Sequence, residues 1–201
     1  MVKTARDRVA ALARAKGFID ARAVARAGIH TQALTRLLAE GTLERVARGR
    51  YRLAKAEVSE HHGLVLAAVA APVSVVCLLS ALSFHGIGTQ LPAEVWLAVE
   101  RGRTEPKIPK LRLRIVHYSG RAFSEGIEVH EVERQRVRVY SVAKTLADLF
   151  KARNRVGLDV AVEALREAWR NRRFTMTELD RAARSCRVER VMRPYVEAVV
   201  A

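Results

Sequence analysis

Four polar side chains that can hydrogen-bond to nucleic-acid bases lie close together in the sequence: Thr31, Gln32, Thr35 and Arg36. A helix that begins at His30 or Thr31 and ends at Gly41 places them opposite Leu34, Leu37 and Leu38. Gln can pair with adenine and Arg with guanine through two hydrogen bonds each. The segment therefore predicts the recognition helix of a helix-turn-helix, whose polar face enters the major groove of DNA. The simpler alternative is an ordinary solvated helix face.

A run of arginines follows this helix around Gly49, and its members are Arg45, Arg48, Arg50 and Arg52. Leu43, Tyr51 and Leu53 supply apolar strand positions on the two sides of the glycine, which indicates a β-hairpin. Arginines on such a hairpin can bind phosphates or enter a narrow minor groove. Residues 1–55 contain thirteen Lys and Arg against four Asp and Glu, a net charge of +9. We therefore expect this hairpin to add to the affinity for duplex DNA.

The elements that must position these side chains come before them. Residues 5–16 have the apolar period of a helix that ends at Gly17, and residues 21–27 form a second helix that Asp20 caps and Gly28 ends. Three helices followed by a β-hairpin is the order of a winged helix-turn-helix. The sequence therefore predicts a DNA-binding domain over residues 1–55.

The rest of the chain, residues 56–201, is expected to fold as a second domain after the polar stretch 55–60. Its patterns predict helices followed by strands and then more helices, while 73–79 fits either a buried strand or the start of a helix. The fold class is therefore α+β, with a helical C-terminal end. The expected helices cover 60–71, 80–86, a segment that Ser141 caps, 156–170, 175–185 and 188–199, and the expected strands cover 94–99, 111–118, 126–133 and 136–140.

The second region contains no pattern typical of an active site. It lacks a phosphate-binding loop, a GxGxxG motif and a nucleophile elbow. Glu94 and Glu100 flank a strand without the nearby Asp that a metal-dependent nuclease needs. Its histidines are scattered and are expected to be structural or exposed: His61, His62, His85, His117 and His130. The sequence thus predicts a protein that is not an enzyme and has no catalytic residues, no metal and no cofactor.

A second basic cluster lies toward the C-terminus, in Lys144, Lys151, Arg153, Arg155, Arg166, Arg170, Arg172 and Arg173. Lys144, Asp148 and Lys151 share one helix face, as surface ion pairs commonly do. Acidic residues near the start of a helix and arginines at its end also complement the helix dipole, which is a sufficient structural explanation. The alternative is a second surface for DNA, RNA or an acidic partner protein.

The composition favours a polyanionic partner, because the net charge is +15 and the isoelectric point is about 10.9. No apolar run reaches the length that crosses a bilayer, so we expect no membrane. The N-terminus has no secretory apolar core, and Cys77 and Cys186 belong to no CxxC pair. A cytoplasmic location is therefore expected.

Five segments resemble the AbiEi family of bacterial antitoxins, which regulate transcription in AbiE-type toxin–antitoxin systems. The resemblance lies in Leu38–Leu53, Val76–Gly86, Glu94–Val99, Tyr140–Lys151 and Gly157–Leu165. It implies a two-domain repressor whose winged helix binds inverted repeats in its own promoter. It also implies that the larger domain counteracts a nucleotidyltransferase-like toxin.

Three functions remain open on the sequence. The first is the DNA-binding antitoxin, and the second is a stand-alone winged-helix repressor whose second domain serves oligomerisation or ligand sensing. The third is a nuclease that uses the winged helix to reach its target. The operator sequence and the oligomeric state are not fixed by the residues.

Overall fold

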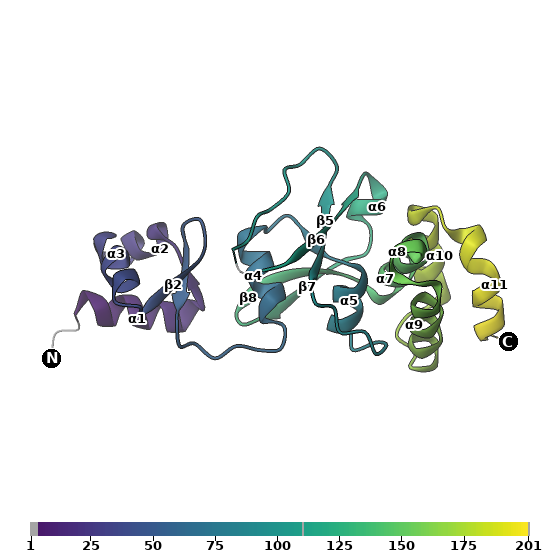
Figure 1. The fold of residues 1–201 in the computed structure, drawn as a ribbon, viewed down its shortest axis with the longest axis horizontal. Coiled ribbons are helices and arrows are strands. Elements are labelled where there is room, and N and C mark those ends of the chain that lie inside the picture. The colour runs from purple at the N-terminus through teal and green to yellow at the C-terminus, as the bar shows by residue number, and fades with distance from the viewer. Residues whose placement is uncertain (1–3, 110, 201) are drawn as a thin grey trace. The chain divides into compact units, whose positions relative to one another are not determined.

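The structure is a computed structural model that describes residues 4–109 and 111–200. The chain divides into two compact units. Unit 1 consists of the described parts of 1–72, 106–110 and 131–136, and unit 2 of the described parts of 73–105, 111–130 and 137–201. Figure 1 shows the elements of both, and each unit is described by itself.

Unit 1 begins with three helices whose ends follow from local sequence signals. Thr4 and Asp7 form a reciprocal capping box at the first helix, and the Asp20 carboxylate accepts a hydrogen bond from the Ala23 amide at the second. The elements between residues 4 and 72 are α1 (Ala5–Lys16), β1 (Phe18–Ile19), α2 (Ala21–Arg26), α3 (Gln32–Ala39), β2 (Leu43–Ala47), β3 (Arg50–Leu53) and α4 (His62–Ala70).

The three strands of unit 1 form an antiparallel sheet in the order β1-β3-β2. Gly49 lies in the tight turn between β2 and β3 with a φ of +70°, a backbone conformation that side chains other than glycine rarely adopt. Helices α1, α2 and α3 and the sheet share one apolar core, formed by Val9, Ala13, Ile19, Val24, Ile29, Leu34, Leu37 and Leu43. This core fixes the orientation of α3.

Unit 2 is built around a five-stranded mixed sheet in the order β6-β5-β4-β8-β7. The pairs β5–β6 and β4–β8 are parallel, whereas β4–β5 is antiparallel. The tip of the β7–β8 hairpin is grouped with unit 1. The elements are β4 (Val75–Val76), α5 (Leu78–Phe84), β5 (Val95–Glu100), β6 (Leu113–Tyr118), α6 (Arg121–Ser124), β7 (Ile127–Val132), β8 (Gln135–Tyr140), α7 (Val142–Lys151), α8 (Arg153–Val156), α9 (Leu158–Arg170), α10 (Met176–Cys186) and α11 (Glu189–Val200).

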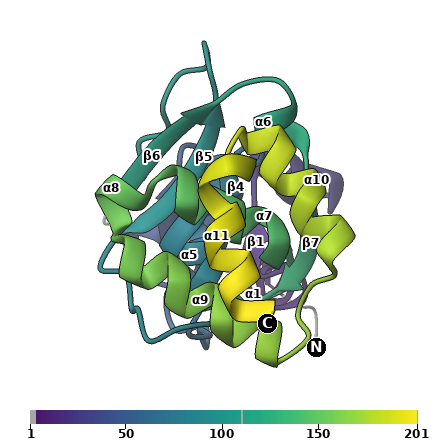
Figure 2. The same cartoon turned by 90° about the vertical axis from the view of Figure 1, so that its right-hand side faces the viewer.

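Helix α7 is the centre of unit 2. It packs against α5, α9, α10 and α11, and every residue from Val142 to Phe150 is buried. The Ser141 side chain caps it by accepting a hydrogen bond from the Lys144 amide. Figure 2 shows α9, α10 and α11 gathered at the C-terminal end of the chain. The core of unit 2 thus joins the sheet to this helical end.

The predicted fold class is confirmed: the chain is a mixed α+β protein with an N-terminal group of three helices and a hairpin, and a helical C-terminal end. The strand β1 and the short helices α6 and α8 were not expected, because two- to four-residue elements leave no periodic pattern. The ambiguous segment 73–79 contains β4 and then the first residues of α5. The division into folding domains at residues 55 and 56 stays a prediction. No helix in the described residues combines the length and apolar character needed to cross a membrane.

Candidate nucleic-acid interface

The outer face of α3 has the arrangement that the sequence predicts. Leu34 and Leu37 are buried in the core of unit 1, while Gln32, Thr35 and Arg36 are exposed. Thr31 occupies the N-cap position and is exposed, but its side chain makes no capping hydrogen bond. The polar side chains at the start of this helix are therefore directed to solvent.

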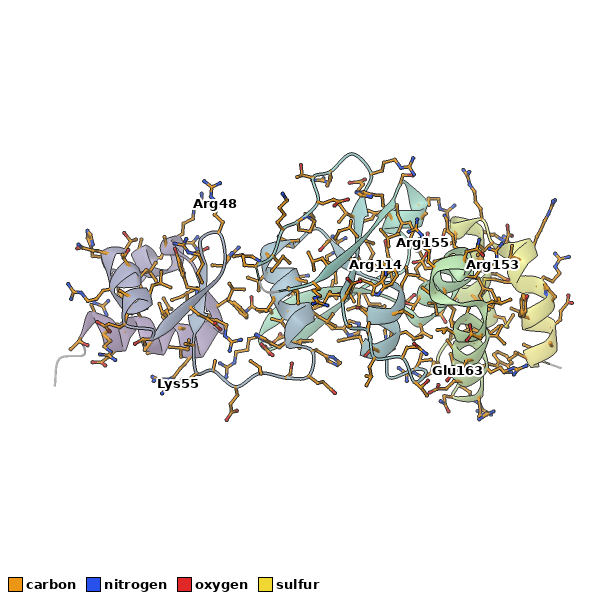
Figure 3. The ribbon with its side chains drawn as sticks, viewed as in Figure 1. Arg48, Lys55, Arg114, Arg153, Arg155 and Glu163 are labelled. Carbon is orange, nitrogen blue, oxygen red and sulfur yellow. The ribbon has the colours of Figure 1, made fainter. Side chains whose placement is uncertain are left out.

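The hairpin places three of its four arginines at the surface. Arg45 lies over the Tyr51 ring at 5.7 Å from its centroid, and Arg50 forms an ion pair of 3.3 Å with Asp20, the residue that caps α2. Arg48 is exposed at the turn, where Figure 3 shows its side chain projecting outward. Arg48 thus lies at the exposed tip of the hairpin.

Arg52 corrects the sequence interpretation, because this side chain is 4% exposed and faces the interior of unit 1. Its guanidinium lies 3.1 Å from a Glu44 carboxylate oxygen and donates to the Leu53 and Ala56 carbonyl oxygens at 3.2 and 3.1 Å. It also lies 2.5 Å from Nε2 of His62. A guanidinium with these partners holds the segment after β3 in place and is not available to DNA.

His62 extends this network to the tip of the β7–β8 hairpin. Because the ionised Glu133 carboxylate can only accept, Nδ1 of His62 carries the proton and donates to a Glu133 oxygen at 2.8 Å. Ser59 donates its amide and its hydroxyl to the other Glu133 oxygen, at 2.8 and 2.9 Å. Burial raises the pKa of Glu133, but the hydrogen bonds from Ser59 and His62 outweigh it and leave that pKa below its usual value. His62 is therefore a structural residue, as the sequence indicated for the histidines.

Lys144 is the second correction, since it is fully buried and cannot belong to a surface. Its Nζ lies 2.6 Å from both oxygens of Asp148, which is also fully buried. The rings of Tyr118 and Tyr140 cover the ammonium at 4.7 and 4.1 Å from their centroids. Burial raises the pKa of Asp148 and the charge of Lys144 opposes this. The pair is a buried ionic centre of the core.

The other predicted residues of the C-terminal cluster lie at or near the surface of unit 2. Arg153 is half-buried and donates to the Phe150 carbonyl oxygen at 3.0 Å, which favours the explanation that it caps a helix end. Figure 3 marks Arg153 and Arg155 on the short helix α8. The exposed members are Lys151, Arg155, Arg166, Arg170, Arg172 and Arg173. They come from α7, α8, α9 and the turn that follows α9.

The remaining candidates for chemistry are paired locally. Glu94 and Glu100 form ion pairs with Arg114 and Arg103, at 3.6 and 3.2 Å. Burial raises the pKa of the Cys186 thiol to about 12, so it is not a reactive thiolate. Among the described residues, no three His, Cys, Asp or Glu side chains are grouped so that they could hold a metal ion.

Comparison with known proteins finds a family similarity in the N-terminal part of the chain. Residues 7–54 match the family model described as "Transcriptional regulator, AbiEi antitoxin". The resemblance found in the sequence is thereby confirmed over these residues, which include α3 and the hairpin. A search of curated proteins gives no match.

A solved structure resembles the whole chain. It is the crystal structure of the RV2827C protein from Mycobacterium tuberculosis, with a TM-score of 0.67 and 12% sequence identity. The alignment covers 99% of this chain and 78% of that one. At this identity the similarity shows that the two proteins share a fold.

Proposed function

We propose that this protein is a DNA-binding transcriptional regulator that uses α3 and the β2–β3 hairpin to bind duplex DNA. The observation that supports this most is the two-sided character of α3. Leu34 and Leu37 anchor it in the core, and the opposite face presents Gln32 and Arg36 to solvent. A recognition helix needs this division, because its side chains must reach base edges while its backbone stays fixed.

The arginines of the hairpin have a separate role in the proposal. Arg48 and Arg50 supply general affinity through phosphate contacts, while Arg36, with Gln32, supplies sequence preference. Arg50 exchanges an exposed ion pair with Asp20 for a phosphate, and such surface pairs cost little to break. Arg52 is excluded from this set because it is buried.

The salt dependence of DNA binding tests the phosphate contacts. We expect log affinity of the full chain for a 25-base-pair duplex to fall linearly with log salt between about 50 and 200 mM. Arg48→Ala should lower the slope by about one, because one phosphate contact is lost. Arg193→Ala, which removes an exposed arginine of α11, is the matched control and should leave the slope unchanged. An affinity that does not change with salt would refute the proposed interface.

We further propose that the protein represses its own operon and counteracts a nucleotidyltransferase-like toxin. This finer proposal is supported by the AbiEi resemblance, which the family model bears out over residues 7–54. Antitoxin activity is assigned to unit 2, since it has its own core and several of the resembling segments. A plain repressor without a toxin is the alternative, and a toxin gene beside this one favours the antitoxin.

Repression and neutralisation can be separated by a promoter exchange. The neighbouring toxin is expressed from an unrelated inducible promoter, so that repression of its own operon cannot protect the cell. The full chain with Arg36→Ala and Arg48→Ala, which should not bind DNA, is expected to restore growth as well as the wild type does. If neither chain restores growth, repression of the toxin promoter is the only protective effect.

A further inference from the structure

Two neighbouring clefts open on unit 2, whereas the elements of the proposed DNA interface belong to unit 1. The first has a volume of about 550 Å³ and the second of about 470 Å³, a size that suits a small ligand. Ser119, Ala122 and Lys151 line both clefts, so the two are continuous with one another. The lining comes from the ends of β5, β6, α7 and α10 together with α6 and α8.

The residues that line these clefts are rich in cations. Among the described residues, their linings contain Lys151 and several arginines but no Asp or Glu, and Glu105 lies 3.6 Å from the lining residue His117. Arg121 and Arg184 also pair with Glu125 and Glu189 at 3.4 and 3.3 Å, but these are exposed surface pairs of low strength. The cationic residues of the linings are Arg101, Arg121, Lys151, Arg155, Arg184 and Arg187. Cations brought together on a concave surface repel one another unless an anion lies between them.

The position of the clefts in the sheet is one at which ligands commonly bind. Strands β5 and β6 are parallel and in register, with Glu100 opposite Tyr118 at their carboxyl ends. Arg101 and Ser119 follow immediately after these two residues and line the first cleft. In open sheets with parallel strands, ligands bind outside the carboxyl ends of the strands.

The buried ionic centre of the core makes the floor of the first cleft rigid. Tyr118 lines this cleft and is 6% exposed, and its ring also covers the Lys144 ammonium inside the core. Lys151 lies two turns further along α7, with its Nζ 5.7 Å from the centroid of the same ring. The position of Lys151 is thus fixed by a fully packed helix, so little order has to be gained when a ligand binds.

Arg187 lines the second cleft from a strained backbone position. This residue ends α10 in the left-handed conformation, with a φ of +59°, and the Val188 amide bonds to the Ala183 carbonyl oxygen across it. Glycine is strongly preferred at this position, because any side chain is strained there. Replacement of Arg187 by glycine therefore removes a cation of the cleft without a cost to the backbone.

We propose that the two clefts form one site for the phosphate groups of a small polyphosphate ligand, in the class of nucleoside triphosphates. Lys151 lines both clefts and contacts the bridging phosphate. The arginines beside it are Arg101 and Arg155 in the first cleft and Arg121, Arg184 and Arg187 in the second. The hydroxyl groups of Ser119 and Ser185 complete the set of donors.

Binding of fluorescently labelled ATP to the full chain tests this site by anisotropy, with competition by ATP, AMP and inorganic triphosphate. We expect saturable binding, with ATP and triphosphate competing far better than AMP. Lys151→Ala and Arg187→Gly should each weaken binding about tenfold or more, as the loss of one charge-assisted contact does. Arg170→Ala removes an exposed arginine that lines neither cleft and should change affinity less than about twofold.

The Arg187→Gly variant separates folding from binding, since glycine relieves the strained backbone. Its thermal unfolding, followed by the fluorescence of Trp96 and Trp169 in unit 2, should occur at the same or a higher temperature than in the wild type. Absence of saturable binding at millimolar ATP, or equal weakening by Arg170→Ala, would overturn the proposal. Competition by a 12-nucleotide single strand but not by triphosphate would overturn it in favour of a nucleic-acid surface.

Discussion

Replacement of Arg52 by alanine separates the structural role of this arginine from the DNA-binding role that its neighbours suggest. The substitution removes the hydrogen bonds to the Leu53 and Ala56 carbonyl oxygens and leaves His62 and Glu44 without their shared cation. Breaking a buried ion pair costs about 3–5 kcal/mol. Glu44 is 42% exposed and recovers solvation, so we expect about 2–4 kcal/mol for unit 1.

Hydrogen exchange of the full chain, resolved by peptide, is the suitable assay. Trp96 and Trp169 both lie in unit 2, so tryptophan fluorescence does not report on unit 1. A loss of about 2–4 kcal/mol corresponds to about 30- to 1,000-fold faster exchange in peptides that cover α1, α3 and β3. Arg48→Ala is the matched control, since its side chain is exposed and should change stability by less than about 0.5 kcal/mol.

The opposite pattern would refute the structural assignment. Exchange in unit 1 that is unchanged by Arg52→Ala, together with a lower salt slope of DNA binding, would show that Arg52 binds phosphate. The contacts to His62 and to the two carbonyl oxygens would then contribute nothing to stability.

Three further predictions concern unit 2 and use its tryptophan fluorescence. Gly126→Ala should destabilise it by about 2 kcal/mol or more, because φ is +69° and the new Cβ would lie 2.7 Å from Cβ of Lys144; unchanged unfolding would contradict this close packing. Lys144→Ala should lower the free energy of unfolding by about 3–5 kcal/mol, because it leaves the buried Asp148 carboxylate unpaired. The double variant with Asp148→Ala should lose clearly less, and equal losses would argue against the ion pair. Burial lowers the pKa of His85, whose Nε2 lies 2.7 Å from the Tyr140 carbonyl oxygen. The contribution of His85 to stability is therefore complete above about pH 6.5 and is lost as the pH falls through its folded-state pKa. His85→Gln should flatten the pH dependence of the unfolding midpoint in this range, and an unchanged slope would assign that dependence to other groups.

The elements that follow a regular period could be predicted from the sequence. The spacing of Leu34 and Leu37 separates the buried and exposed sides of α3, and this separation does not depend on what surrounds the helix. Glycines and capping residues likewise set the ends of α1 and α2. The helical C-terminal end follows from the same kind of pattern in α9, α10 and α11.

The two misplaced cations depend on tertiary contacts that no local pattern contains. Arg50 and Arg52 are two residues apart on β3, so the sequence pattern does not distinguish them. Only Arg52 is covered, because the chain after the strand folds back over it. Lys144 and Asp148 have the spacing of a surface ion pair, yet α7 is packed on all sides. The one available signal was the apolar character of the rest of 142–150, which is typical of a central helix. The residues that line the clefts of unit 2 are spread over positions 101 to 187. Local sequence patterns cannot show that residues so far apart lie together.

The sequence preference of the Arg36→Ala variant tests the central claim most directly. Affinities of the wild type, Arg36→Ala and the control Arg193→Ala are measured on the DNA upstream of the gene and on a random duplex of equal length. We expect Arg36→Ala to lose about 1–3 kcal/mol on the upstream DNA and much less on the random duplex, because a base contact is lost. Equal weakening on both duplexes, or no weakening on either, would contradict the assignment of α3 as the recognition helix.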